Sequence, residues 1–421
     1  MSNKIAMLVI FGAALLPMQV VRAEDARARF ESEREQIASI EKALQMTATS
    51  TDTIFAHDFD ESAAPSCTSD RDADRLNDCV ETGTGRFASA TDTGTSPDSA
   101  DTDGDGLLDG DEVLGTVEGL DLPALGTSPL RRDVLLEYDW FDLTAECGPI
   151  SHRPSAGALA RVSAMFQGAP ITNPDGSTGI NVIHDYGQGG AQVGGNLVTG
   201  YDAVLAGALD AQYHEIKQKN FDPKRLGYFH YVLMAHRYNG GSNSSGYAEI
   251  VGDDMIVSLY CARSDVNVGN TIAHELGHNL GLDHGGFEPC NDKPNYNSIM
   301  NYRYQFAGVD AGCVASGSNS TANFSRGDRV ALDENALNEP QGVCGTQPID
   351  WNRDGAMQAA LTMDLNASHG GTCGGTLTQL EDFDDWANLT YAGVLDKHGL
   401  LKNIQRETEC AGAPPPEKGA Q

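Results

Sequence analysis

The fold and the chemistry of this chain are best predicted from residues 271–284, which read Thr271-Ile-Ala-His274-Glu275-Leu-Gly-His278-Asn-Leu-Gly281-Leu-Asp-His284. His274 and His278 are four residues apart, so on a helix both imidazoles lie on one face and can bind the same ion. Glu275 is one residue round from that face, where its carboxylate can reach a water without occupying the metal. Gly281 permits a turn at positive φ that returns His284 as a third ligand. Three neutral imidazoles leave one position open, which is typical of a catalytic zinc site.

A methionine follows in the segment Asn297-Ser-Ile-Met300-Asn-Tyr302, 16 residues after His284. The two segments together resemble the signature of the metzincin clan of zinc metalloendopeptidases, and the resemblance rests directly on residues 271–302. Chance is improbable, because the glycine and third histidine lie at fixed offsets from the short H-E-x-x-H core. The resemblance implies that Met300 forms a hydrophobic floor beneath the ligands. It also implies that Tyr302 approaches the metal or stabilises the oxyanion; a core tyrosine with a satisfied hydroxyl is the alternative.

The residue types also predict the reaction. Zinc lowers the pKa of a bound water and polarises the scissile carbonyl, while Glu275 takes the water's proton and delivers it to the leaving amine. We therefore expect a zinc-dependent endopeptidase acting on a protein or peptide substrate. One alternative is a non-catalytic, calcium-dependent binding or adhesion protein with a silent zinc site, against which the intact Glu275 argues. Another is a zinc hydrolase of amide bonds in cell-wall material.

Hydrophobic patterns upstream of the histidines predict alternating strands and helices. Strands are expected at 134–138, 181–184, 228–235 and 255–259, and helices at 155–167, 201–218 and from about 268. With the metzincin resemblance, these elements imply an α+β catalytic domain over residues 130–410. We expect a twisted mixed sheet, an active-site helix and an irregular lower part after Gly281, followed by a flexible tail at 411–421.

An acidic segment, residues 58–129, precedes this domain and contains an internal repeat. Residues 58–121 hold 18 aspartates and glutamates against 3 arginines and no lysine. The first loop (residues 70–81) recurs at an offset of 31 as the second loop (residues 101–112), and Gly-Thr-Ser-Pro at 94–97 recurs at 126–129. Each loop matches the ligand spacing of a calcium loop, with a backbone carbonyl at the leucine. The predicted ligands are Asp70, Asp72, Asp74, Leu76, Asp78 and Glu81, and Asp101, Asp103, Asp105, Leu107, Asp109 and Glu112.

Carboxylates at this spacing repel one another unless a cation lies between them, so the loops predict bound Ca²⁺ as a structural cofactor. Gly106 supplies the residue needed for the sharp turn in the second loop, whereas the first loop carries Arg75 there and is the weaker prediction. The repeats resemble thrombospondin type 3 repeats more than EF-hands, because no long helices flank both sides. A solvated acidic linker is the alternative.

Residues 1–23 have the features of a secretory signal peptide: Lys4, an apolar run at 5–21 and a cleavage site at Val21-Arg22-Ala23. A membrane anchor fits less well, since the run is short and holds Gly12 and Pro17. We therefore expect a secreted, extracellular or periplasmic protein with no membrane attachment after cleavage. Residues 24–57 begin with an amphipathic helical pattern, which suits either a removed propeptide or a helix packed on the main domain.

All 9 cysteines follow the signal sequence, so most should form disulfides in an oxidising compartment, with at least one left over. The net charge of −32 argues against nucleic acid and anionic membrane surfaces as partners, because both would be repelled. Neither the oligomeric state nor the cleavage preference is indicated by the sequence.

Overall fold

The computed structural model describes residues 67–143, 146–240, 242–318, 320–367 and 374–391, together with the backbone of 405–406. The predicted signal peptide (1–23), the helical segment (24–57) and the tail (411–421) lie outside the described residues. Within the described part, no helix is long and apolar enough to cross a membrane.

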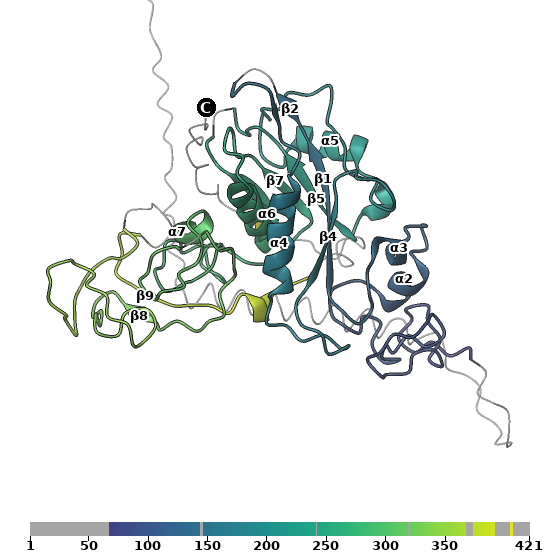
Figure 1. Ribbon diagram of the computed structural model, residues 1–421, viewed down its shortest axis with the longest axis horizontal. Coiled ribbons are helices and arrows are strands. Elements are labelled where there is room, and N and C mark those ends of the chain that lie inside the picture. The colour runs from purple at the N-terminus through teal and green to yellow at the C-terminus, as the bar shows by residue number, and fades with distance from the viewer. Residues whose placement is uncertain are drawn as a thin grey trace, which may run out of the picture.

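A mixed sheet forms the centre of the molecule, with the strand order β10-β6-β7-β5-β1-β4 among the described residues (Figure 1). Strands β4, β1, β5 and β7 run parallel, while β6 and β10 are antiparallel to their neighbours. The predicted mixed sheet is thus confirmed, and the described chain combines it with helices. The strands are β1 (Asp133–Trp140), β4 (Asn181–Asp185), β5 (Phe229–Met234), β6 (Gly246–Ile250), β7 (Asp254–Val257) and β10 (Gln405–Arg406).

Helices cover both faces of this sheet because its strands alternate apolar side chains between two cores. Val134 and Leu136 of β1 join a core with α4 and α6, whereas Leu135 joins a second core with α5 on the opposite face. We call the part of the chain built on this sheet the sheet domain. Its longer helices are α4 (Ala156–Gln167), α5 (Ala211–Asn220) and α6 (Asp265–Asn279).

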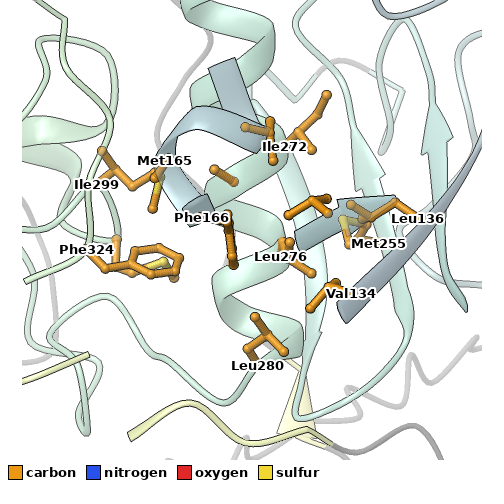
Figure 2. Packing of buried hydrophobic residues seen from close by; sticks show 14 of the residues in the cluster. Val134, Leu136, Met165, Phe166, Met255, Ile272, Leu276, Leu280, Ile299 and Phe324 are labelled. Atoms are coloured by element: carbon orange, nitrogen blue, oxygen red, sulfur yellow. The ribbon is translucent and has the colours of Figure 1, made fainter. Parts of the chain in front are cut away.

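Figure 2 shows the apolar core that holds α6, the helix that contains His274 and His278. Full burial of one large aliphatic side chain stabilises a fold by roughly 2 kcal/mol, so this core fixes the helix firmly. Side chains from α4, the sheet and the downstream chain meet there. They include Ile272, Leu276 and Leu280 of α6, Met165 and Phe166 of α4, Val134, Leu136 and Met255 of the strands, and Ile299 and Phe324.

Three elements differ from the sequence predictions. The helix expected at 201–218 begins only at Ala211, because the Asp210 side chain caps it by accepting from the backbone N–H groups of Gln212 and Tyr213. Strand β6 was not predicted, since it is short and follows a Gly-, Ser- and Asn-rich stretch. The start of α6 is also earlier than expected, at Asp265, where Ser264 supplies the cap.

The chain after Gly281 is irregular, as predicted, and lies to one side of α4 and α6 in Figure 1. It is tied to the sheet domain by Trp386, whose ring meets Phe166 of α4 edge-on with centroids 5.5 Å apart. Its regular elements are short. They are α7 (Tyr302–Gln305), β8 (Leu332–Asp333), β9 (Gln379–Leu380) and the 3₁₀ turn η3 (Trp386–Asn388).

The acidic segment lies at the opposite side of the sheet domain in Figure 1 and contains two short helices, α2 (Asp109–Leu114) and α3 (Leu122–Leu125). They are 6 and 4 residues long, so the described loops lack the long flanking helices of an EF-hand. The remaining short elements of the fold are β2 (Asp142–Leu143), β3 (Ile150–Ser151) and the 3₁₀ turn η2 (Pro223–Arg225).

Disulfides link Cys67 to Cys79, Cys147 to Cys261 and Cys313 to Cys344. Cys290 is also disulfide-bonded, so all the cysteines in the described part of the chain are paired. The bond between Cys147 and Cys261 joins the loop after β2 to the chain just before α6. This disulfide therefore fixes the chain that leads into α6, from outside the apolar core.

Candidate metal centres

The three histidines converge at the end of α6. His274 and His278 lie one turn apart on the helix, and Gly281 adopts φ 93°, so the chain turns back as expected. The backbone N–H of Leu282 donates to the carbonyl of Gly277, which closes this turn. One ring nitrogen of each of His274, His278 and His284 lies within 4.8 Å of the others, and all three side chains are buried.

Two of these rings are oriented by backbone carbonyls. Nδ1 of His274 lies 2.7 Å from the carbonyl oxygen of Ile299, and Nδ1 of His278 lies 2.7 Å from that of Leu282. A carbonyl oxygen only accepts, so each Nδ1 carries a proton and each neutral ring turns an unprotonated Nε2 to the other. The two Nε2 atoms are 3.3 Å apart. Burial, with His278 nearby, holds the pKa of His274 well below its usual value.

Two lone pairs that face each other in a buried site are suited to a shared cation and to little else. The pKa of the third histidine is lowered as well, because burial and the two other histidines hold the pKa of His284 well below its usual range. Asp283 accepts a hydrogen bond from the backbone N–H of His284 at 2.7 Å, and its Oδ1 lies 3.7 Å from Nδ1 of that ring. Asp283 therefore belongs to the surroundings of the third histidine.

Glu275 is fully buried and lies between α6 and the antiparallel strand β6. A Cβ atom at Gly246 would overlap Oε1 of Glu275, so the strand must have a glycine opposite the carboxylate. Sequence reasoning missed this residue because it missed β6. The available signal was an isolated glycine at the start of the pattern Gly246-Tyr-Ala-Glu-Ile250.

The segment that contains Met300 packs against α6. Met300 is fully buried, and a Cβ at Gly277 would overlap its sulfur, so Met300 lies directly against the helix between the two histidines. The preceding carbonyl, of Ile299, is the one that orients His274. Tyr302 begins α7 and is partly buried, with its ring centroid 4.4 Å from that of His284 and 6.1 Å from that of His274. The structure thus brings the rings of His274, His278, His284 and Tyr302 together, while the carboxylate of Glu275 lies against Gly246 of β6.

The two acidic loops share a pattern of backbone hydrogen bonds. Asp70 accepts from the backbone N–H groups of Ala73 and Arg75, and Asp101 accepts in the same way from Gly104 and Gly106. At the fifth position of each loop, Asp74 accepts from Leu76 N–H and Asp105 from Leu107 N–H. The carboxylates at the ninth position brace the loops, since Asp78 accepts from Arg71 N–H and Asp109 from Thr102 N–H.

Arg75 occupies the sharp turn of the first loop, at the position that Gly106 holds in the second loop. It adopts φ 83°, close to the 89° of Gly106, although this region disfavours a side chain by roughly 1–2 kcal/mol. Its guanidinium forms an ion pair with Asp111 and donates to the carbonyl of Gly115 at 2.7 Å. These contacts with the second loop offset the strain, so the two loops form one packed unit.

Both loops contain buried carboxylates without hydrogen-bond partners in the described part of the chain. Neither oxygen of Asp72, Asp103 or Glu112 has a hydrogen-bond partner within the described ranges. Burial, followed by repulsion from neighbouring carboxylates, raises the pKa of Asp103 to about 9 and that of Asp72 to about 6. The same causes raise the pKa of Glu81 to about 8 and that of Glu112 well above its usual value. Ions bound among these oxygens would remove the repulsion.

The carboxylate groups that could hold an ion differ in part from the predicted sets. One ligand atom each of Asp70, Asp72 and Asp74 lies within 4.8 Å of the others, as does one each of Asp101, Asp103 and Asp105. Asp109 of the second loop groups instead with Asp74 and Glu81 of the first, and Asp133 of β1 groups with Asp105 and Glu112. Asp133 was not among the predicted ligands, because loop spacing identifies only ligands within the loop.

Comparisons with protein-family models, with curated proteins and with solved structures found no match. The assignment of a function therefore depends on the chemistry of the residues described above.

Proposed function

We propose that this chain is a zinc-dependent endopeptidase in which His274, His278 and His284 hold the metal and Glu275 is the general base. The observation that carries the proposal is the pair of Nε2 atoms 3.3 Å apart, each on a ring whose Nδ1 is already bonded to a carbonyl. Two nitrogens bound to a tetrahedral zinc at 2.0–2.1 Å are about 3.3 Å apart, so the spacing suits that ion. A buried glutamate next to this pair supports a catalytic site rather than a structural one.

Each residue of the site has a distinct task in this reaction. Zinc supplies Lewis-acid activation of water and of the scissile carbonyl. Glu275 accepts the proton of the attacking water and returns it to the leaving amine. Its carboxylate is held for this task by its buried position against Gly246. The carbonyls of Ile299 and Leu282 hold the imidazoles in the tautomer that presents Nε2. Tyr302, whose ring lies beside that of His284, would donate to the developing oxyanion.

We also propose that the acidic loops bind Ca²⁺ as a structural cofactor. Their ligands are carboxylate oxygens, which suit a hard cation, and Asp103 and Glu112 are buried without a partner in the described chain. Export is part of the proposal. The disulfides fit an oxidising compartment, and the predicted signal peptide at 1–23 would deliver the protein there.

Casein digestion tests the proposed activity. The purified protein, in excess calcium, should convert casein into internal fragments, and a zinc-selective chelator should abolish the cleavage until zinc is restored. Mass spectrometry of the products identifies the cleaved bonds. Intact casein in the presence of the zinc-loaded protein would contradict the endopeptidase assignment. Cleavage of cell-wall peptide amides with no cleavage of casein would point to the other kind of zinc hydrolase.

Replacing Tyr302 by phenylalanine should lower turnover by roughly 10²–10³-fold with a smaller effect on zinc affinity, because the loss of one oxyanion donor has that typical effect. The measurements are kcat on a quenched peptide and zinc content after dialysis. Tyr304→Phe is the matched control, since its hydroxyl lies in the same helix but donates to the carbonyl of Pro294 in the core. Equal kinetics for the two variants would return Tyr302 to a packing role.

A further inference from the structure

The strongest unassigned feature of the molecule lies where the second acidic loop meets the sheet domain. Asp103 and Glu112 of the loop are each only 3% exposed, and none of their four carboxylate oxygens has a hydrogen-bond partner in the described ranges. Buried carboxylates without partners are strongly unfavourable, so a ligand that neutralises them is expected. We call the group formed by Asp101, Asp103, Asp105, Glu112 and Asp133 the junction cluster.

Asp133 is the member of this cluster that comes from outside the loop. It is the first residue of β1, and one of its carboxylate oxygens lies within 4.8 Å of ligand atoms of Asp105 and Glu112. Its backbone N–H donates to Asp105 at 2.7 Å. Its carboxylate is held by the backbone N–H of Ser128 at 2.7 Å and by the side-chain amide of Asn181 on β4. The sheet therefore presents a rigidly positioned carboxylate to the loop.

A second contact joins the same loop to the end of the described chain. A Cβ at Gly106 would lie 3.4 Å from Cβ of Tyr391, so the turn of the loop packs against that residue. The hydroxyl of Tyr391 is buried and has no partner among the described residues. The neighbouring Thr390 donates its backbone N–H to the carbonyl of Leu280, at 2.8 Å, just after the end of α6. Tyr391 and Thr390 thus connect the second loop to the turn that returns His284.

Two cations of the protein lie close to the cluster. Arg131 forms an ion pair with Asp133 at 3.5 Å, and Arg132 has a guanidinium nitrogen 3.4 Å from the Cβ position of Gly104. Their two positive charges stand beside five carboxylates, so they cannot neutralise them all. The remaining charge and the oxygen-only ligand set favour a divalent hard cation. Calcium suits the cluster better than magnesium, because it accepts many protein oxygens in flexible geometry, whereas magnesium keeps several waters.

We infer that a calcium ion in the junction cluster fastens the acidic segment to the sheet domain, with Asp133 of β1 as the ligand that the sheet contributes. The inference rests on the proposed calcium binding of the loops and not on the proposed zinc chemistry. The ion links two parts of the chain, so its removal frees the segment from β1. The chain between Glu112, the last ligand of the loop, and Asp133 then becomes accessible to proteases.

Calcium titration of Asp133→Asn tests this inference without any measurement of turnover. Isothermal titration calorimetry of Ca²⁺ into chelator-treated protein should show one class of site weakened at least about tenfold, since the number of charged ligands sets calcium affinity. Trypsin gives a second reading, because Arg131 and Arg132 lie at the junction. Cleavage after these residues, located by mass spectrometry, should be slow in calcium and fast in a chelator for the wild type, and fast in both for Asp133→Asn.

Asp142→Asn is the matched control, because Asp142 is an exposed aspartate just beyond the opposite end of β1. It should bind calcium as the wild type does, while Glu112→Gln should behave like Asp133→Asn. Equal calcium affinity in Asp133→Asn and Asp142→Asn would overturn the inference but leave calcium binding by the loops intact. A wild type that binds no calcium would refute both. If Asp133→Asn fails to fold, the wild type decides: tryptic cleavage at the junction that is equal with and without calcium contradicts the fastening role.

Discussion

Glu275→Ala should keep its zinc while losing peptide-bond hydrolysis by several orders of magnitude. The ligands survive because His274 and His278 are oriented by the carbonyls of Ile299 and Leu282, which the substitution does not touch. What is lost is the group that moves the proton, and a positioned acid–base side chain alone contributes roughly 10²–10⁴-fold. Elemental analysis of bound zinc beside turnover of a quenched peptide measures both effects in one preparation.

The isosteric variant Glu275→Gln is the matched control. Alanine leaves a space between α6 and Gly246 where the carboxylate was, and the helix could shift into it. Glutamine fills that space but accepts a proton poorly, so it should be as inactive as alanine with an unchanged melting temperature. Near wild-type turnover in either zinc-replete variant would remove the general base role from Glu275.

Calcium removal should produce the largest change in stability. An ion that binds only the folded state stabilises it by about 4 kcal/mol at a 1,000-fold excess over its Kd, because the unfolded chain lacks the assembled carboxylates. For a domain of this size the melting temperature should therefore fall by roughly 10 °C in a calcium-selective chelator. Zinc content should not change, since imidazole nitrogens suit a different metal from carboxylate oxygens. The measurement is a pair of melting curves, with and without calcium.

The double variant Asp103→Ala/Asp105→Ala should shrink this calcium-dependent shift. Asp72→Ala/Asp74→Ala in the first loop should shrink it less, since that loop folds only with Arg75 at φ 83°. The size of the shift is the quantity to compare, because removing carboxylates also relieves their repulsion and can raise the stability of the calcium-free form. A wild type that melts at one temperature in both conditions would show the loops to be acidic linkers.

Much of the sheet domain could be predicted from local sequence patterns. Strand β1 and helix α4 are continuous apolar or amphipathic runs with clear boundaries, and the histidine spacing placed the ligands on one helix face. Their structure follows from short-range periodicity, which a single sequence contains. The positive φ of Gly281 is of the same kind, because one residue type at one offset is enough to predict it.

The features of the sites that escaped prediction join parts of the chain that are distant in sequence. Gly246 is required by a carboxylate 29 positions later, and Asp133 meets a loop whose last predicted ligand is Glu112. Asp109 is another case, since it completes a group with Asp74 and Glu81 of the other loop. Sequence spacing within one motif contains no information about these pairings. They depend on how the sheet, α6 and the loops pack together.

The contacts of Gly106 and Asp105 with Tyr391 and Asp133 also have a consequence for biosynthesis. During translation the acidic segment is the first of the described regions to emerge, yet its anchoring residues are made later, and one of them is Tyr391. The segment made first is therefore among the last to reach its final conformation. Until Asp133 and Tyr391 are made, the second loop lacks the contacts that surround it in the folded protein.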